Sequence, residues 1–71
     1  MKITISDLKS EIIKEFSYAV EKSTLLITFS KGGVYSYADV PVALFYRFIA
    51  AESHGKFFHA EIRKSYVGVK Q

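Results

Sequence analysis

The sequence predicts a small α+β domain, in which a three-stranded antiparallel β-meander is followed by two helices packed on one face of the sheet. Three observations support this prediction. Residues 24–30 alternate between apolar and polar side chains, which is typical of a half-buried strand. Two consecutive glycines, Gly32 and Gly33, then mark a turn before a second alternating segment. After Pro41 the apolar residues recur at helical spacing, so strands precede helices, as in α+β domains.

The first predicted strand spans residues 10–19. Its alternation places Ile12 on the apolar side, together with two aromatic residues, and Ile13 on the opposite side. Lys14 interrupts the apolar side, which favours a position at the edge of the sheet, because edge strands often carry charged side chains. The pattern of residues 1–9 fits either a strand or a short helical turn.

The loop before the third predicted strand (residues 34–38) decides which face of the sheet Tyr35 and Tyr37 occupy. A two-residue turn would direct both tyrosines away from the apolar face, whereas a three-residue loop would pair Phe29 with Tyr35 and bring both onto it. We favour the three-residue loop, because Gly33 can adopt the left-handed backbone conformation that a bulged loop requires. The tyrosines are then predicted to pack at the margin of the core.

Two helices are predicted after the meander. The first runs from Pro41 to Glu52, and proline suits the first helical position because its missing N–H group has no partner there. Gly55 is predicted to cap the C-terminal end of this helix. A second helix, residues 56–64, would bury Phe58 and Ile62 on one side. The apolar stripe of the first helix consists of Leu44, Phe45, Phe48 and Ile49.

Composition limits the classes of function. The 71 residues form one domain, and the lack of cysteine excludes disulfides and thiolate zinc sites. No apolar run approaches the roughly 18–20 residues of a membrane span, and the N-terminus lacks the apolar block of a signal peptide, so we expect a cytoplasmic protein that does not bind membranes. His54 and His59 lie five residues apart across a glycine, so they do not share a helix face as a paired-histidine metal motif requires. We expect no metal, no cofactor and no enzymatic activity, because no nucleophile has an activating local context.

The net charge of +3 comes entirely from the C-terminal part of the chain. Residues 1–52 contain six Lys/Arg and six Asp/Glu, whereas residues 53–71 contain four Lys/Arg and a single Glu. A basic segment among aromatic residues predicts contact with RNA or another polyanion, although a solvated helix face would give the same pattern. The candidate contact residues are Arg47, Lys56, Arg63 and Lys64.

Several short motifs, taken in order, resemble the KTSC domain, a short module of bacteria and phages named for its occurrence at the C-terminus of some lysyl-tRNA synthetases. The motifs are Leu25-x-Ile27-x-Phe29, Gly33, Tyr35-x-Tyr37, Val40-Pro41, Ala51-x-Ser53-x-Gly55-x-Phe57-Phe58, Ile62 and Tyr66. The resemblance covers residues 10–66, so residues 1–9 lie outside it and residues 10–71 form the KTSC-like domain. The family positions to which we assign a structural role are Tyr35, Tyr37, Pro41, Gly55 and Phe58.

The resemblance implies a stand-alone domain of unknown function, for which attachment to a synthetase suggests RNA binding. His59, where the family pattern leads us to expect Asn, and a tail less basic than is usual both depart from that pattern. The competing interpretation is a protein-interaction or homo-oligomerisation module, with Leu26 and Ile13 forming an apolar patch on the open face of the sheet. The sequence leaves the choice between monomer and homodimer open. Aromatic rings on a sheet can also stack on bases, but we interpret Tyr35 and Tyr37 as packing residues.

Overall fold

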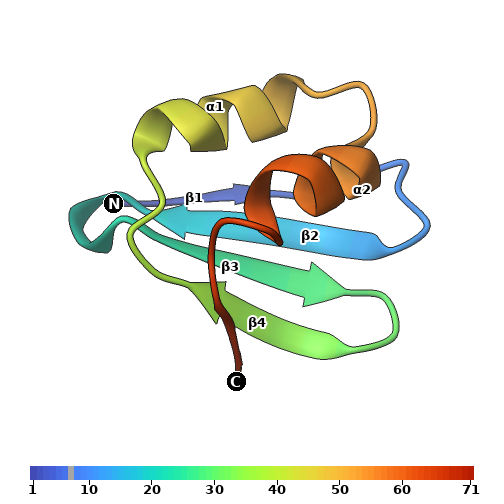
Figure 1. Ribbon diagram of the computed structural model, residues 1–71, viewed down its shortest axis with the longest axis horizontal. Coiled ribbons are helices and arrows are strands. Elements are labelled where there is room, and N and C mark those ends of the chain that lie inside the picture. Colours follow the sequence, from blue (N-terminus) through green and yellow to red (C-terminus); the bar gives the residue numbers. More distant parts are fainter. Residues whose placement is uncertain (7) are drawn as a thin grey trace.

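Across residues 1–6 and 8–71, which the computed structural model describes, five antiparallel strands form one sheet and two helices lie over one of its faces (Figure 1). The strands follow one another across the sheet in chain order, so each pairs with its sequence neighbour. They are β1 (Lys2–Ile5), β2 (Ile13–Ala19), β3 (Thr24–Phe29), β4 (Gly33–Tyr37) and β5 (Gly68–Lys70). The helical elements are η1 (Val20–Lys22), α1 (Val42–Ala50), α2 (His54–Phe57) and η2 (Phe58–Ile62), a π-helical turn that continues α2.

The prediction of three strands is wrong, because β1 and β5 add one strand on each side of the meander. In β1, Ile3 lies opposite Tyr18 of β2. In β5, Gly68 lies opposite Tyr37 of β4, so the chain returns to the sheet after the helices. These strands have only four and three residues, and all three residues of β5 are exposed. The strand alternative for residues 1–9 is therefore the correct one, whereas the three residues of β5 are too few for an alternating pattern.

A β-bulge in β2 reverses the predicted roles of Ile12 and Ile13. The pairing with β3 shifts between Ile13 and Glu15, so Lys14 is the additional residue. Ile13 is therefore fully buried in the core, whereas Ile12 is 38% exposed. A bulge adds one residue to one strand, so alternation counted across it assigns residues to the wrong face. Lys14 marks this bulge and not a sheet edge, because β1 pairs with the other side of β2.

Tyr35 and Tyr37 lie on the helix-covered face, as predicted, although their pairing differs from the predicted one. Phe29 lies opposite Gly33 rather than opposite Tyr35. The register thus differs by two residues, and such a difference leaves every side chain on its predicted face. Gly33 has a φ of 83°, the left-handed conformation expected for it. Tyr37 is 5% exposed and Tyr35 is half-buried.

The helix α1 covers the sheet with the predicted stripe, in which Phe45 and Phe48 are fully buried. Pro41 is its N-terminal cap and directly precedes the first helical residue. The prediction that Gly55 caps this helix is wrong: α1 ends at Ala50, and Gly55 lies inside α2. A Cβ atom at Gly55 would approach the Ile12 side chain to 3.0 Å, so this glycine permits close packing of α2 on the chain before β2.

Ser53 is the N-terminal cap of α2, because its hydroxyl accepts a hydrogen bond from the Lys56 N–H group at 3.2 Å. The second helical segment consequently begins two residues before the predicted start, and His54 is its first residue. The buried positions Phe58 and Ile62 are as predicted. None of the helices in the described residues is long and apolar enough to cross a membrane.

The centre of the core is a set of stacked aromatic rings between β2 and α1. The rings of Phe16 and Phe48 stack with centroids 4.1 Å apart, and those of Tyr18 and Phe45 with centroids 4.6 Å apart. The buried Tyr18 hydroxyl donates a hydrogen bond to the Val40 carbonyl, which satisfies the polar end of this ring. This part of the helix-covered face is therefore closed.

Candidate functional site

Arg47, one of the four predicted contact residues, already has a partner within the protein. Its guanidinium group lies 3.5 Å from the Glu61 carboxylate and 5.5 Å from the centre of the Phe57 ring. Both charged side chains are largely exposed, so this ion pair contributes at most about 1 kcal/mol. The pair nevertheless offsets the charge of Arg47, which makes this arginine the least suited of the four to bind an anion.

Lys56, Arg63 and Lys64 share one exposed surface, which we call the cationic face. Lys56 lies in α2, whereas Arg63 and Lys64 lie in the turn that follows η2. Together with His59 and Ala60 they line an open depression of about 600 Å³. Among residues 1–6 and 8–71, none of these three cations forms an ion pair. The structure thus brings together three of the four predicted cations.

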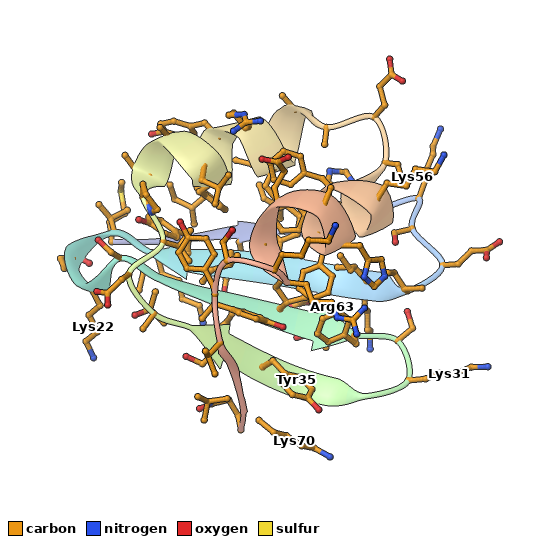
Figure 2. The ribbon with its side chains drawn as sticks, in the orientation of Figure 1. Lys22, Lys31, Tyr35, Lys56, Arg63 and Lys70 are labelled. Atoms are coloured by element: carbon orange, nitrogen blue, oxygen red, sulfur yellow. The ribbon has the colours of Figure 1, made fainter. Side chains whose placement is uncertain are left out.

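A second depression, of about 290 Å³, opens beside Arg63 between η2 and the β4–β5 side of the sheet. Tyr37 and Phe58 are buried beneath it, whereas Tyr35 and Tyr66 are half-buried at its sides. Figure 2 shows the Arg63 side chain extending from the end of η2 toward Tyr35. We call this depression the aromatic groove. Its principal lining residues are Phe29, Tyr35, Tyr37, Phe58, Arg63 and Tyr66.

Edge-to-face ring contacts join the aromatic residues that line the groove. The Phe58 ring meets the Phe29 ring at a centroid distance of 5.2 Å and the Tyr37 ring at 5.8 Å, both nearly perpendicular. The Phe29 ring meets the Tyr35 ring at 5.7 Å in the same manner. Such contacts pack the edge of one ring against the face of the next, and all four rings also line the groove.

The close packing of β5 on Tyr37 forms one side of the groove. A Cβ atom at Gly68 would lie 2.8–2.9 Å from atoms of the Tyr37 ring and hydroxyl, closer than packed atoms tolerate. Only glycine therefore allows the returning chain to pair with β4 over this tyrosine. The groove depends on a contact between two segments that are more than thirty residues apart in the sequence.

The Tyr37 hydroxyl is a hydrogen-bond donor at neutral pH. Burial raises the pKa of the Tyr37 phenol, the neighbouring Tyr35 phenol raises this pKa further, and the Arg63 guanidinium opposes both effects. Within residues 1–6 and 8–71, the hydroxyls of Tyr35 and Tyr37 take part in no hydrogen bond. Both are available to a ligand in the groove.

Two further lysines, which the sequence does not indicate, lie on the hairpin and β5 side of the aromatic groove, Lys70 beside Tyr35 and Lys31 extending outward from the β3–β4 loop (Figure 2). Lys70 is opposite Tyr35 in the β4–β5 ladder, and its aliphatic chain passes near Gly33. Lys31 is in the β3–β4 loop and borders a depression of about 350 Å³ that also reaches Phe29 and Tyr35. The position of Lys70 depends on β5, so no local sequence signal indicates it.

The two histidines occupy different environments. The His54 ring packs near Phe16 and Phe48, and its Nε2 atom lies 3.4 Å from the Ile49 carbonyl oxygen. His59 is exposed at the rim of the aromatic groove. Within residues 1–6 and 8–71, no three His, Cys, Asp or Glu side chains gather as a group of metal ligands.

Comparison with known proteins assigns this architecture to a family. The model of the KTSC domain matches residues 9–66. No curated protein matches the sequence. The crystal structure of a KTSC domain protein from Yersinia pestis superposes with a TM-score of 0.92 and 27% sequence identity, covering 100% of this chain and 99% of that chain. The protein therefore belongs to the KTSC domain family.

Proposed function

We propose that this KTSC domain is a non-enzymatic, cytoplasmic RNA-binding protein. The observation that carries this proposal is the continuity of the cationic face with the aromatic groove, since Arg63 belongs to both. Proteins that bind nucleic-acid strands combine cations that contact phosphates with aromatic rings that contact bases. The α2 helix and the turn after η2 supply the first component, and the β3–β4 hairpin supplies most of the second, together with Phe58 and Tyr66.

The phosphate backbone is the part of RNA that the cationic face recognises. Arg63 presents a planar guanidinium group that can donate two hydrogen bonds to one phosphate, whereas Lys56 and Lys64 act as compact charges. Three neutralised phosphates give a slope of about −2 for the logarithm of the binding constant against the logarithm of salt concentration on single strands. Such binding is weak at physiological salt and is best measured at low salt.

Fluorescence anisotropy with fluorescein-labelled single-stranded RNA, measured at increasing salt, tests this proposal. Arg63→Gln and Lys64→Gln are expected to weaken binding and to reduce the salt slope, each by removing one phosphate contact. Lys22→Gln is the matched control, because Lys22 is exposed on η1, at the opposite end of β3 from the β3–β4 loop (Figure 2). The proposal is wrong if the wild-type protein does not bind RNA at low salt, or if Lys22→Gln weakens binding as much as Arg63→Gln.

Self-association is the second candidate function. The open face of the sheet carries Leu26, with Ser36 and the 58% exposed Val69 in the same row across the strands. Ile13, which the sequence analysis placed in this patch, lies in the core instead, so the apolar area is smaller than expected. Sedimentation equilibrium distinguishes the candidates: a mass above the 8.1 kDa monomer that Leu26→Ser restores to the monomer value would favour self-association.

A further inference from the structure

The geometry points to an unpaired nucleobase as the occupant of the aromatic groove, so the ligand is single-stranded rather than duplex RNA. This inference rests on the RNA binding proposed above and names the form of RNA that the site accepts. It concerns the groove formed by Tyr35, Tyr37, Phe58 and Tyr66, whereas the proposed backbone binding concerns the cationic face.

The dimensions of the groove suit a single flat ring system. Its volume of about 290 Å³ lies near the lower limit of roughly 300–1,000 Å³ for pockets that hold drug-sized molecules. A large cofactor would therefore not be accommodated, but one base with its ribose would be. The half-buried rings of Tyr35 and Tyr66 retain surface that faces the groove, and aromatic side chains stack on any base.

Polar groups around the groove match the edge of a base. The hydroxyls of Tyr35 and Tyr37 are not used within the described residues 1–6 and 8–71, and the exposed His59 ring lies at the rim. A phenol can donate or accept one hydrogen bond, and an imidazole can do either according to its tautomer. These groups can therefore bind the polar edge of a base while the rings bind its faces.

Cations lie on both sides of the groove, so a strand can pass across it. Lys56 and Lys64 are on the helical side. Lys31 and Lys70 are on the side of the hairpin and β5 (Figure 2). Arg63 lies between the two sides, at the position where the phosphate next to an inserted base would pass. In a duplex the bases are paired and stacked, so none can enter the groove unless it is first extruded.

Three labelled probes of equal length test the inference: oligouridylate of about eight nucleotides, a duplex RNA, and an oligonucleotide with the same backbone but abasic positions. The wild-type protein is expected to bind oligouridylate about tenfold more tightly than either other probe at the same salt concentration. Tyr35→Leu is expected to abolish this difference while leaving duplex binding unchanged. Leucine retains apolar packing at this half-buried position, so a change in binding reports the loss of the aromatic ring and not a loss of stability.

Tyr46→Leu is the matched control, because Tyr46 is a 57% exposed tyrosine on α1, outside the groove. It is expected to bind all three probes as the wild type does. Amide chemical shifts should identify the site independently, with changes at Tyr35 and Tyr66 for oligouridylate that are missing for the abasic probe.

The outcomes separate this inference from the proposed function. If all three probes bind equally and Tyr35→Leu changes nothing, while Arg63→Gln weakens all three, RNA binding stands and the base site is wrong. If polyglutamate displaces oligouridylate from the groove as effectively as unlabelled oligouridylate does, the groove accepts an acidic peptide and the base site is again wrong. If no probe binds at low salt, the proposed function itself is wrong.

Discussion

The helix-covered face of the sheet has two aromatic regions that differ in how completely they are covered. Over β2, Phe16 and Tyr18 are stacked against Phe48 and Phe45 of α1 and are each 1% exposed. Over β4, the neighbouring rings meet η2 at their edges, and Tyr35 remains half-buried beside an open groove. The two regions contain the same residue types on the same face of one sheet.

The difference arises from the helix that covers each region. The nine residues of α1 bury two phenylalanines against β2, while the five residues of η2 place Phe58 as their aromatic contact with β3 and β4. Over β2, the two phenylalanines of α1 cover Phe16 and Tyr18 with stacked and perpendicular contacts, whereas Phe58 contacts Phe29 and Tyr37 and leaves Tyr35 half-buried. Aromatic composition alone therefore does not distinguish a closed core from an open groove; the number of rings that the covering helix buries against the sheet does.

Alanine substitution in the two regions gives the largest expected contrast. Phe16→Ala leaves a cavity in the closed region and is expected to cost about 3–5 kcal/mol of unfolding free energy. Tyr35→Ala removes a half-buried ring next to solvent and is expected to cost less than about 2 kcal/mol. Urea unfolding followed by circular dichroism measures both values. Equal losses would show that the groove is part of the core and not a separate region.

Adding a methyl group at the side of the groove is expected to have the next largest effect. Gly68→Ala places a Cβ atom against the Tyr37 ring, so either β5 leaves β4 or the ring moves into the groove. Overpacking of this kind costs about 1–3 kcal/mol. Loss of amide protection in β5, with protection in β2 unchanged, is the expected result of hydrogen exchange. Val69→Ala is the control, since Val69 is exposed in the same strand.

Two tyrosine-to-phenylalanine variants compare how much the hydroxyl groups of Tyr18 and Tyr37 contribute to the free energy of unfolding. Tyr18→Phe deprives the buried Val40 carbonyl of its donor and is expected to cost about 1 kcal/mol. Tyr37→Phe removes a hydroxyl that makes no hydrogen bond within residues 1–6 and 8–71, so its cost should be close to zero. Chemical denaturation of the two variants provides the comparison. A larger loss for Tyr37→Phe than for Tyr18→Phe would contradict it.

The ionisation of Tyr37 at alkaline pH gives the smallest expected effect, and it concerns the groove. Burial, followed by the Tyr35 phenol, raises the pKa of Tyr37 above its ordinary value of 10.0. The unfolded chain thus releases this proton at a lower pH than the folded chain, so stability is fully retained below pH 10.0 and falls as pH rises through the folded-state pKa. Unfolding measured between about pH 8 and 11 should show a smaller decline for Tyr37→Phe than for the wild type. Identical declines in the two proteins would exclude ionisation of Tyr37 as a cause of the loss of stability.

The parts of the fold that could be predicted are those in which local pattern and tertiary packing agree. The alternation of β3, the apolar stripe of α1 and the left-handed glycine before β4 each indicate the observed element. The bulge at Lys14 could not be predicted, because it shows only in the pairing with β3. The same holds for Gly55, which resembles a helix cap in sequence but permits the contact of α2 with Ile12.

The candidate site was predictable to a similar degree. Lys56, Arg63 and Lys64 are close in sequence and line one depression, although the helical segment ends at Ile62, before the last two. The pairing of Arg47 with Glu61 depends on how α1 packs beside η2, and the sequence does not indicate it. The aromatic groove was missed for the same reason as β5, because its side is made by a segment that returns from the opposite end of the chain.

The short strand β5 makes one wall of the groove less stable than the rest of the domain. Three exposed residues pair with β4, and one further hydrogen bond runs from the Gln71 N–H group to the Val34 carbonyl. A segment with so few buried contacts opens at a far lower free energy than the global unfolding of the domain. We therefore expect the groove to lose and regain one wall while the stacked core over β2 stays intact. A bound strand of RNA that contacts Lys70 would shift this equilibrium toward the paired state of β5. Binding would then appear as slower amide exchange at Gly68–Lys70.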